Sequence, residues 1–310
     1  IGPYGASLCA ISGLDMALLD LKGKHYGLPV YELLGGAFRR EILLYANYWF
    51  TGGGLSPAEY SSAASQVMEA GFTGVKFDPF AHTSYFYGEN LAPNLGLTER
   101  QKDLAEEVTA AVREAIGPES AMMIETHAML NFQAACEMAN RLSPYGVTWF
   151  EEPVGPENVE TLAAFRTRIP AEVPICVGER HYTRSGIRPV LERQLCDIIM
   201  PDITRCGGPS ELKRMATMAE AYGVLIAPHN PNGPLSTLAS AHVCASLPNF
   251  FRQEFMFHDV PWRDEVIDHP LDIRDGHLHL SDRPGLGADL VEDELERHPG
   301  IREMREGFYV

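Results

Sequence analysis

The chain has 310 residues, of which 45% are hydrophobic and 22% charged. This balance supports a folded core and excludes a disordered, collagen-like or coiled-coil protein. Lys and Arg number 25 against 42 Asp and Glu, which gives a formal net charge of −17. Nucleic-acid binding depends on basic residues that neutralise phosphates, so the sequence argues against a nucleic-acid partner and favours a metal cation.

Targeting signals are not apparent in the sequence. The first residues, IGPYGASLCAISGLD, have neither the basic start nor the long apolar core of a secretory signal. No apolar run approaches the roughly 18 residues that span a bilayer, so we expect a cytoplasmic protein without membrane contact. The six cysteines are scattered without a CxxC pair, which is typical of reduced core residues rather than of disulfides or a zinc site. Because the chain starts with Ile rather than Met, we expect an N-terminal segment to be missing.

The first predicted element is a helix followed by a turn over residues 10–35. Ile11, Leu14, Leu18 and Leu21 recur along it at helical spacing, so the helix is predicted to be amphipathic.

Short β-branched or aromatic runs then alternate with helical stretches. Several runs are apolar at consecutive positions, which is typical of parallel strands buried on both faces. The eight runs are LLYANYW (43–49), FTGVKF (72–77), AMMIE (121–125), VTWFE (147–151), VPICVG (173–178), CDIIMP (196–201), VLIAPH (224–229) and NFFRQEF (249–255).

The intervening stretches carry signals for helix starts. Ser56 with Glu59, and Thr98 with Gln101, match the capping-box pattern, and residues 209–222 place their apolar side chains on one helical face.

Eight strand–helix units between residues 41 and 255 predict a closed (β/α)8 barrel. An open doubly wound sheet fits less well, because no GxGxxG motif follows the first strand. Residues 256–310 are loop-like and rich in Asp, His and Pro, as expected of a segment that wraps over another module.

Nearly every predicted strand from the second to the eighth ends in an ionisable residue. Reactive groups of a (β/α)8 barrel project from the carboxyl ends of its strands, so these residues are the candidates for a site. They are Lys76, Asp78, Glu125, His127, Glu151, Glu152, Glu179, Asp202, His229 and Glu254.

Three of these residues have the spacing of a metal site. Glu125, Glu151 and Glu179 stand 26 and 28 residues apart, one barrel unit each, and so end three successive strands. Carboxylates this close repel one another unless a cation neutralises them, and oxygen ligands without cysteine favour Mg2+. A single Glu at such a position is more often a solvated rim residue, but three in register predict a Mg2+ site.

Two histidines are candidates for proton transfer. Asp202 and His229 end consecutive strands, and a carboxylate beside an imidazole fixes its tautomer and raises its basicity. His127 lies two residues beyond Glu125 and is expected across the barrel mouth from His229. The pair predicts an acid and a base on opposite sides of one substrate, although either histidine alone has an equal claim as a hydrogen-bonded rim residue.

The strings at the strand ends resemble a known family. They are KFD, IETH, WFEEP, VGER, IIMPDITRCGG, APHNPNGP and QEF, in the order of the second to the eighth strand. Together with DRPGLG in the tail, they resemble the enolase superfamily, within it the mandelate racemase subgroup, and most of all its acid-sugar dehydratases of the galactonate and gluconate type. The resemblance covers the chain from about Ile11 to the tail.

This resemblance implies a domain organisation and an assembly. The barrel of 41–255 is expected to follow an N-terminal α+β capping domain that is apparently missing from this chain. Residues 1–40 are then an entry helix at the junction with that domain, and 256–310 pack back toward it. The resemblance also implies a homo-oligomer.

The same resemblance implies ligands for the metal and for the charged intermediate. Glu125, Glu151 and Glu179 match the three Mg2+ ligands of the family. Glu254 matches the acid that hydrogen-bonds the enolate oxygen, and Lys76 matches the lysine that contacts the substrate carboxylate.

Roles in proton transfer follow in the same way. His229 with Asp202 matches the pair that removes the proton α to the carboxylate, and His127 matches the histidine that protonates the departing 3-hydroxyl. Because that proton is too weakly acidic for imidazole alone, Mg2+, Lys76 and a protonated Glu254 are expected to stabilise the enolate. The product would be a 2-keto-3-deoxy acid.

Contacts with the substrate are expected from several residues around the mouth. The long connection 79–97 is predicted to line the site, although a surface or oligomer-contact role has nearly equal support. Tyr87 is a further candidate on this connection. The expected substrate contacts are Lys76, Asp78, Tyr85, Arg180 and Glu254.

Two positions depart from the family pattern. Glu125 stands where the family usually has Asp and is one methylene longer, which would shift the ion or mark a less studied branch, so the resemblance does not specify the exact substrate. Asp78 stands where racemases and cycloisomerases commonly carry a lysine base, which argues against racemisation.

Dehydration of an aldonic acid such as galactonate or gluconate is therefore the leading hypothesis. A racemase or epimerase of a 2-hydroxy acid that uses the same site is the second. A non-catalytic relative that binds a sugar acid, or a barrel recruited for assembly, is the third, and the complete set of ligands, base and acid speaks against it.

Overall fold

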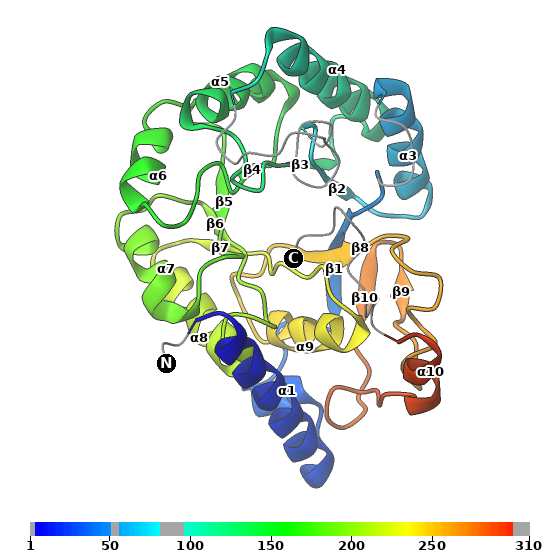
Figure 1. Cartoon of the computed structure of the whole chain (residues 1–310). Helices are drawn as coiled ribbons and strands as arrows, with labels where there is room; N and C mark the ends of the chain where they lie inside the picture. The colour runs from blue at the N-terminus through cyan, green and yellow to red at the C-terminus, as the bar shows by residue number, and fades with distance from the viewer. Residues whose placement is uncertain (1–3, 51–55, 81–95, 300–310) are drawn as a thin grey trace.

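The computed structural model describes residues 4–50, 56–80 and 96–299. Within these ranges, eight parallel strands form a barrel surrounded by helices, which confirms the predicted (β/α)8 architecture (Figure 1). The barrel strands are β1 (Glu41–Asn47), β2 (Gly74–Phe77), β3 (Ala121–Glu125), β4 (Trp149–Glu151), β5 (Ile175–Val177), β6 (Ile198–Ile199), β7 (Leu225–Ile226) and β8 (Gln253–Met256). The helices between them are α3 (Pro57–Glu69), α4 (Glu99–Ile116), α5 (Phe132–Leu142), α6 (Val159–Arg166), α7 (Thr183–Glu192), α8 (Gly208–Ala221) and α9 (Pro234–Ala245), with a short 3-10 turn η1 (Ser143–Tyr145) after α5.

Hydrogen bonding closes the barrel. Strands pair in the order β7-β6-β5-β4-β3-β2-β1, β8 pairs with β1, and a parallel bridge between Ile226 and Phe250 joins β7 to the segment before β8. Each of the eight predicted runs overlaps one of these strands, although β1 begins two residues before its run and β8 ends one residue after its run.

Alternation along the strands divides the core in two. Met122 and Phe150 belong to the large cluster between strands and helices, whereas their neighbours Met123 and Trp149 belong to a smaller cluster inside the barrel. Because strand side chains alternate between faces, the next inward position on β4 after Trp149 is Glu151. The alternation thus places carboxylates above the smaller cluster inside the barrel. This cluster, the apolar plug, consists of Tyr45, Ala121, Met123, Trp149, Cys176, Ile198, Met200 and Ala227.

Both predicted capping boxes are present. The Ser56 side chain accepts a hydrogen bond from the backbone N–H of Glu59 at the start of α3, and Thr98 accepts one from Gln101 at the start of α4. Each box supplies acceptors for backbone donors that a helix N-terminus leaves without an intrahelical partner.

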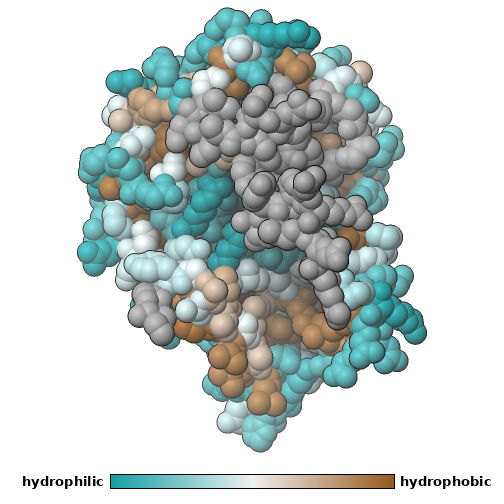
Figure 2. All heavy atoms as spheres, in the orientation of Figure 1, coloured by the Kyte–Doolittle hydropathy of each residue, from teal (hydrophilic) through white to brown (hydrophobic). Residues whose placement is uncertain are grey.

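The first helix, α1 (Ala6–Tyr26), differs from its sequence-based description. Leu14, Leu18 and Leu21 are all more than 60% exposed. The helix instead contacts α8 through small and polar groups, because Ser12 accepts from the N–H of Gly207 and Asp15 accepts from that of Ser210. Figure 2 shows the apolar side chains of α1 as brown atoms on the surface.

The C-terminal segment extends the sheet at the amino end of β1. Strand β10 (His277–His279) pairs antiparallel with β1 and with β9 (Ile273–Arg274), and Gly285 bridges to Pro29 just before α2 (Val30–Leu33). A last helix, α10 (Glu292–Arg297), follows. The predicted division of the chain at residues 40 and 255 stays a prediction.

No helix in the described part of the chain combines the length and the apolar character needed to cross a membrane.

Candidate active site

A cavity of about 420 Å³ opens at the carboxyl ends of the barrel strands. Side chains from six of the strand ends line it, and most of them are ionisable. They include Asn47 at the end of β1, Lys76 on β2, Glu125 on β3, Glu179 after β5, His229 after β7 and Met256 on β8. The sequence-based expectation that strand ends supply the site therefore agrees with the position of the cavity.

Glu125, Glu151 and Glu179 converge at the floor of this cavity. Each offers a carboxylate oxygen within 4.8 Å of one from the other two, and all three are buried. Burial and the charge of Glu125 raise the pKa of Glu151 well above its usual range. A divalent cation relieves this cost, because hard oxygen ligands at such distances match its coordination. The donor set therefore fits a divalent metal.

Two donors from the barrel interior hold Glu151. The indole N–H of Trp149 donates to Oε2 of Glu151 at 2.6 Å, and Lys76 forms an ion pair with Oε1. Lys76 is itself fully buried and lies 3.4 Å from Oε2 of Glu125. Although burial opposes its charge, these carboxylates raise the pKa of Lys76 well above its usual value, so it is a permanent cation in the site.

The protonation state of Glu254 differs from the sequence-based expectation. Its Oε1 accepts from Nδ2 of Asn47 at 2.7 Å and pairs with Lys76 at 2.8 Å, while its Oε2 accepts from the N–H of Asn230 at 2.6 Å. Burial alone would raise the pKa of Glu254, but Lys76, His229 and these donors lower it below its usual value. The geometry favours an ionised Glu254, and the expectation of a protonated acid at this position is corrected.

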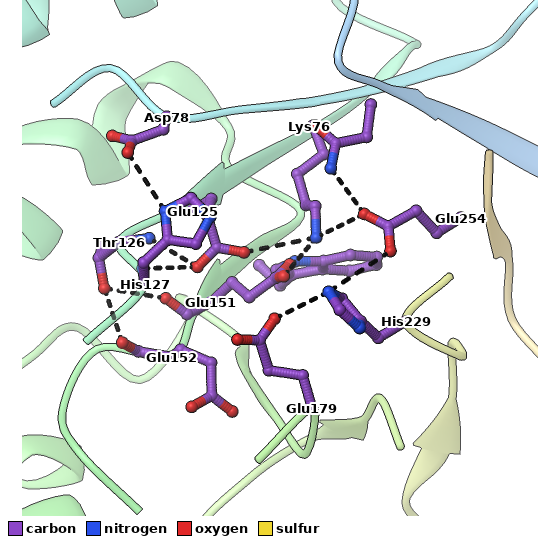
Figure 3. A network of polar contacts seen from close by, with 12 residues as sticks. Lys76, Asp78, Glu125, Thr126, His127, Glu151, Glu152, Glu179, His229 and Glu254 are labelled. Carbon is purple, nitrogen blue, oxygen red and sulfur yellow. Dashed lines mark hydrogen bonds and ion pairs between the residues drawn. The ribbon is translucent and has the colours of Figure 1, made fainter. Parts of the chain in front are cut away.

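His229 has the partners expected of a general base. Its Nδ1 lies 2.9 Å from Oδ2 of Asp202. Its Nε2 lies 3.1 Å from Oε2 of Glu179 (Figure 3). Burial opposes protonation, but Glu179, Glu254 and Asp202 together raise the pKa of His229. Burial raises the pKa of Asp202, but the hydrogen bond and charge of His229, together with Thr204 and Arg205, outweigh it and lower the pKa to about 2, so the carboxylate stays charged.

His127 lies on the other side of the carboxylates from His229 (Figure 3). It follows β3 in a left-handed backbone conformation with φ of 50°, and its N–H donates to Oε1 of Glu125 at 2.6 Å. Its Nδ1 lies 3.2 Å from Oδ2 of Asp78. Burial disfavours the charged ring, but the charge of Glu125 and the bond to Asp78 outweigh it and raise the pKa of His127 to about 9. A protonated ring is the form that a general acid needs.

The expected substrate contacts have different positions. Arg180 lines the cavity and lies 3.2 Å from Glu179 through Nη2. Asp78 also lines the cavity, but its carboxylate is turned toward His127. Tyr85, Tyr87 and most of the connection 79–97 lie outside the described residues, so their predicted contacts stay predictions.

The sequence reasoning missed two site residues, Asn47 and Arg205. It named Glu152 as a candidate but gave it no role. Asn47 ends β1 on the inward side, two residues after Tyr45, so strand alternation would have identified it. Arg205 lines the cavity 3.6 Å from Oδ2 of Asp202. Glu152 accepts from the N–H of Gly178 at 2.7 Å, and burial beside Glu179 raises its pKa to about 8.

Comparisons with known proteins agree with this geometry. The chain is 34% identical over 299 residues to the D-xylonate dehydratase of Haloferax volcanii, covering 95% of this chain and 70% of that protein. It is 33% identical to the D-gluconate dehydratase of Thermoproteus tenax, covering 94% of this chain and 56% of that protein. It is 34% identical to the D-galactarolactone cycloisomerase of Agrobacterium fabrum, covering 95% of this chain and 75% of that protein. The chain thus spans little more than half the length of one of these relatives.

A solved structure shows the same fold. A mandelate racemase/muconate lactonizing enzyme-like protein from Rubrobacter xylanophilus superposes with a TM-score of 0.88 at 38% identity, covering 96% of this chain and 78% of that one. The family model of the enolase C-terminal domain-like fold matches residues 59–294, and that of the mandelate racemase/muconate lactonizing enzyme N-terminal domain matches residues 4–35. The chain therefore belongs to the enolase superfamily, in its mandelate racemase/muconate lactonizing enzyme family.

Proposed function

We propose that this protein dehydrates an acid sugar, an aldonic acid of the galactonate or gluconate kind, to a 2-keto-3-deoxy acid. One observation carries the proposal. His229 and His127 lie on opposite sides of a carboxylate trio that fits a metal, so that one base and one acid address a single bound molecule. Relatives whose names include xylonate and gluconate dehydratase support the same reaction class.

Binding of the acid sugar depends on cations in the cavity. Glu125, Glu151 and Glu179 would hold Mg2+, whose positive charge stabilises negative charge that develops on the substrate carboxylate. Lys76 and Arg180 are the side-chain cations nearest to this trio in the cavity wall, and they would attract and orient that carboxylate. Because Lys76 is buried and always charged, it also stabilises the enolate without reorganisation.

Removal of the proton at C2 is assigned to His229. Asp202 engages Nδ1, so Nε2 is the atom that accepts the proton, and Nε2 points toward Glu179 at the cavity floor. The ion pair with Asp202 stabilises the imidazolium that forms. The electrons of the C2–H bond pass into the enolate.

Loss of the 3-hydroxyl is assigned to His127. Its ring gives a proton to the leaving oxygen as the C3–O bond breaks, so the hydroxyl departs as water. The enol that remains takes up a proton at C3 and becomes the 2-keto-3-deoxy acid. Solvent returns the proton that His127 has lost and removes the one that His229 has gained, so that atoms and charges balance.

Epimerisation of a 2-hydroxy acid is the second candidate. Two histidines on opposite faces can also remove and return a proton at one carbon, and a cycloisomerase is among the similar proteins. Against it, the second strand carries Asp78 rather than a lysine base.

The experiment combines the full-length protein and Mg2+ with a panel of aldonic and aldaric acids, and detects the keto product with semicarbazide. We expect a signal that EDTA and His229→Asn abolish and that the exposed control His269→Asn leaves unchanged. Silence with solvent deuterium still entering C2 would support epimerisation. Absence of both product and exchange across the panel would overturn the proposal.

A further inference from the structure

Hydrogen bonds within its own part of the barrel fix the position of Asp78. It follows β2 directly, its side chain is 2% exposed, and its Oδ1 accepts from the N–H of Phe80 at 2.7 Å. Its backbone carbonyl accepts from the hydroxyl of Tyr60 on α3 at 3.1 Å. These two bonds leave the second carboxylate oxygen with a fixed direction.

Oδ2 of Asp78 points toward the imidazole of His127. Oδ2 of Asp78 lies 3.2 Å from Nδ1 of the imidazole, and both side chains belong to the cavity wall (Figure 3). The backbone fixes the ring from the other side, because His127 and Ala128 have φ of 50° and 54° and the N–H of His127 donates to Glu125. Two successive left-handed residues are costly and persist only where the surroundings hold them.

The arrangement repeats the one around His229. There, Oδ2 of a buried Asp202 lies 2.9 Å from Nδ1. In both pairs the carboxylate engages Nδ1, so Nε2 is the ring atom that exchanges a proton with the substrate. The barrel thus carries two Asp–His pairs, one on each side of the carboxylate trio.

We propose that Asp78 is the positioning residue of His127, and that it holds the imidazole in the orientation that delivers a proton from Nε2 to the leaving 3-hydroxyl. This inference rests on the proposed dehydration. It replaces the expected substrate contact of Asp78, because both carboxylate oxygens already accept hydrogen bonds from the protein.

The test separates elimination from enolisation. Asp78→Asn keeps an acceptor for Phe80 but loses the charge that faces His127. We expect kcat for dehydration to fall by about 10²-fold while KM and deuterium exchange at C2 change little. Asp202→Asn, the matched variant of the other pair, is expected to lose exchange and dehydration together, whereas the exposed Asp264→Asn should behave as wild type.

A substrate analogue distinguishes loss of the acid from general damage. A 3-deoxy-3-fluoro aldonic acid loses fluoride, which needs less help from a proton donor than hydroxide. Asp78→Asn should therefore eliminate fluoride at nearly the wild-type rate. Equal impairment on both substrates, or a raised KM with unchanged kcat, would overturn the proposal in favour of a structural role or a substrate contact.

A spectroscopic readout makes the pair testable apart from the reaction. In wild-type protein we expect a low-field Nδ1–H proton resonance, assigned by its loss in His127→Asn, that moves upfield in Asp78→Asn. A wild-type protein that dehydrates no acid would overturn the proposed function, and with it the catalytic role of the pair. An Nδ1–H resonance unchanged in Asp78→Asn would overturn the positioning contact itself.

Discussion

Trp149 occupies the barrel interior below the site and links the apolar plug to the carboxylates. It is fully buried, packs edge-on against Tyr45, and donates its indole N–H to Glu151 at 2.6 Å. Groups that orient a metal ligand contribute strongly to affinity, although they do not touch the ion.

Trp149→Phe should therefore weaken the metal site. Phenylalanine retains an aromatic ring in the plug but cannot orient Oε2 of Glu151, so we expect affinity for Mg2+ to fall by about 10- to 100-fold, measured by titration calorimetry. Phe165→Leu is the control, because Phe165 is also buried and stacks on Phe150 between strand and helix, away from Glu151. Equal affinities in wild type and Trp149→Phe would show that the indole has only a packing role.

Contacts between elements explain why α1 lies where it does. A Cβ added at Gly23 would lie 2.6 Å from the carbonyl oxygen of Leu28 and 2.7 Å from Cα of Gly285, whereas one added at Gly13, in the same helix, meets nothing within 4 Å. Gly23 therefore allows the DRPGLG turn to approach the helix.

The two glycines should respond oppositely to alanine. Gly13→Ala should raise the free energy of unfolding by about 0.5–1 kcal/mol, because alanine loses less backbone entropy in a helix. In Gly23→Ala the steric clash exceeds this gain, and we expect a net loss of about 1–3 kcal/mol, measured by urea unfolding. Stabilisation by both substitutions would contradict the close contact.

His242 on α9 joins α2 to the C-terminal segment. Its Nδ1 accepts from the N–H of Tyr31, and its Nε2 lies 3.2 Å from the carbonyl of Leu286, so the ring is neutral in the folded protein. Burial lowers its pKa from 6.5 to about 4. Between these values the unfolded chain binds more protons than the folded one, so the stabilisation is complete above the unfolded pKa and is lost as the pH falls toward about 4.

This pair of pKa values predicts a pH-dependent stability. From about pH 7 to about pH 5, His242 should cost the wild-type protein about 2 kcal/mol of unfolding free energy. In His242→Gln, whose amide can reproduce both hydrogen bonds, that part of the loss should disappear from urea titrations at the two pH values. The exposed His269→Gln should keep the wild-type slope, and an identical slope in His242→Gln would refute the assignment.

At the scale of the whole molecule, a net charge of −17 and a buried trio of carboxylates should couple folding to cations. Ligands that bind only the folded state stabilise it by mass action. A second group of acidic and imidazole side chains, Glu265, Glu294 and His298, lies near the surface and provides an internal comparison.

Mg2+ at about a hundredfold above its Kd should stabilise the wild-type protein by about 2.7 kcal/mol and raise Tm by several degrees. The shift should vanish in Glu179→Gln and persist in Glu265→Gln, as followed by calorimetry in Mg2+ against EDTA. The reverse pattern would place the ion at the surface group.

The order of strands and helices and the ionisable residues at the strand ends could be predicted from the sequence, because they depend on local patterns. Consecutive apolar runs specify buried strands, capping boxes specify helix starts, and one barrel unit separates Glu125 from Glu151. Side-chain alternation then decides which strand residues point inward.

Only the tertiary structure decided which groups meet. Glu254 is ionised because barrel closure brings Asn47, Lys76 and the backbone of Asn230 to its two oxygens. Asp78 reaches His127 across 49 positions of sequence. Leu14, Leu18 and Leu21 of α1 face outward, while Leu8 is buried and Ser12 and Asp15 bond to the start of α8. Such pairings depend on distances set by the closed barrel, and no local pattern along the chain contains those distances.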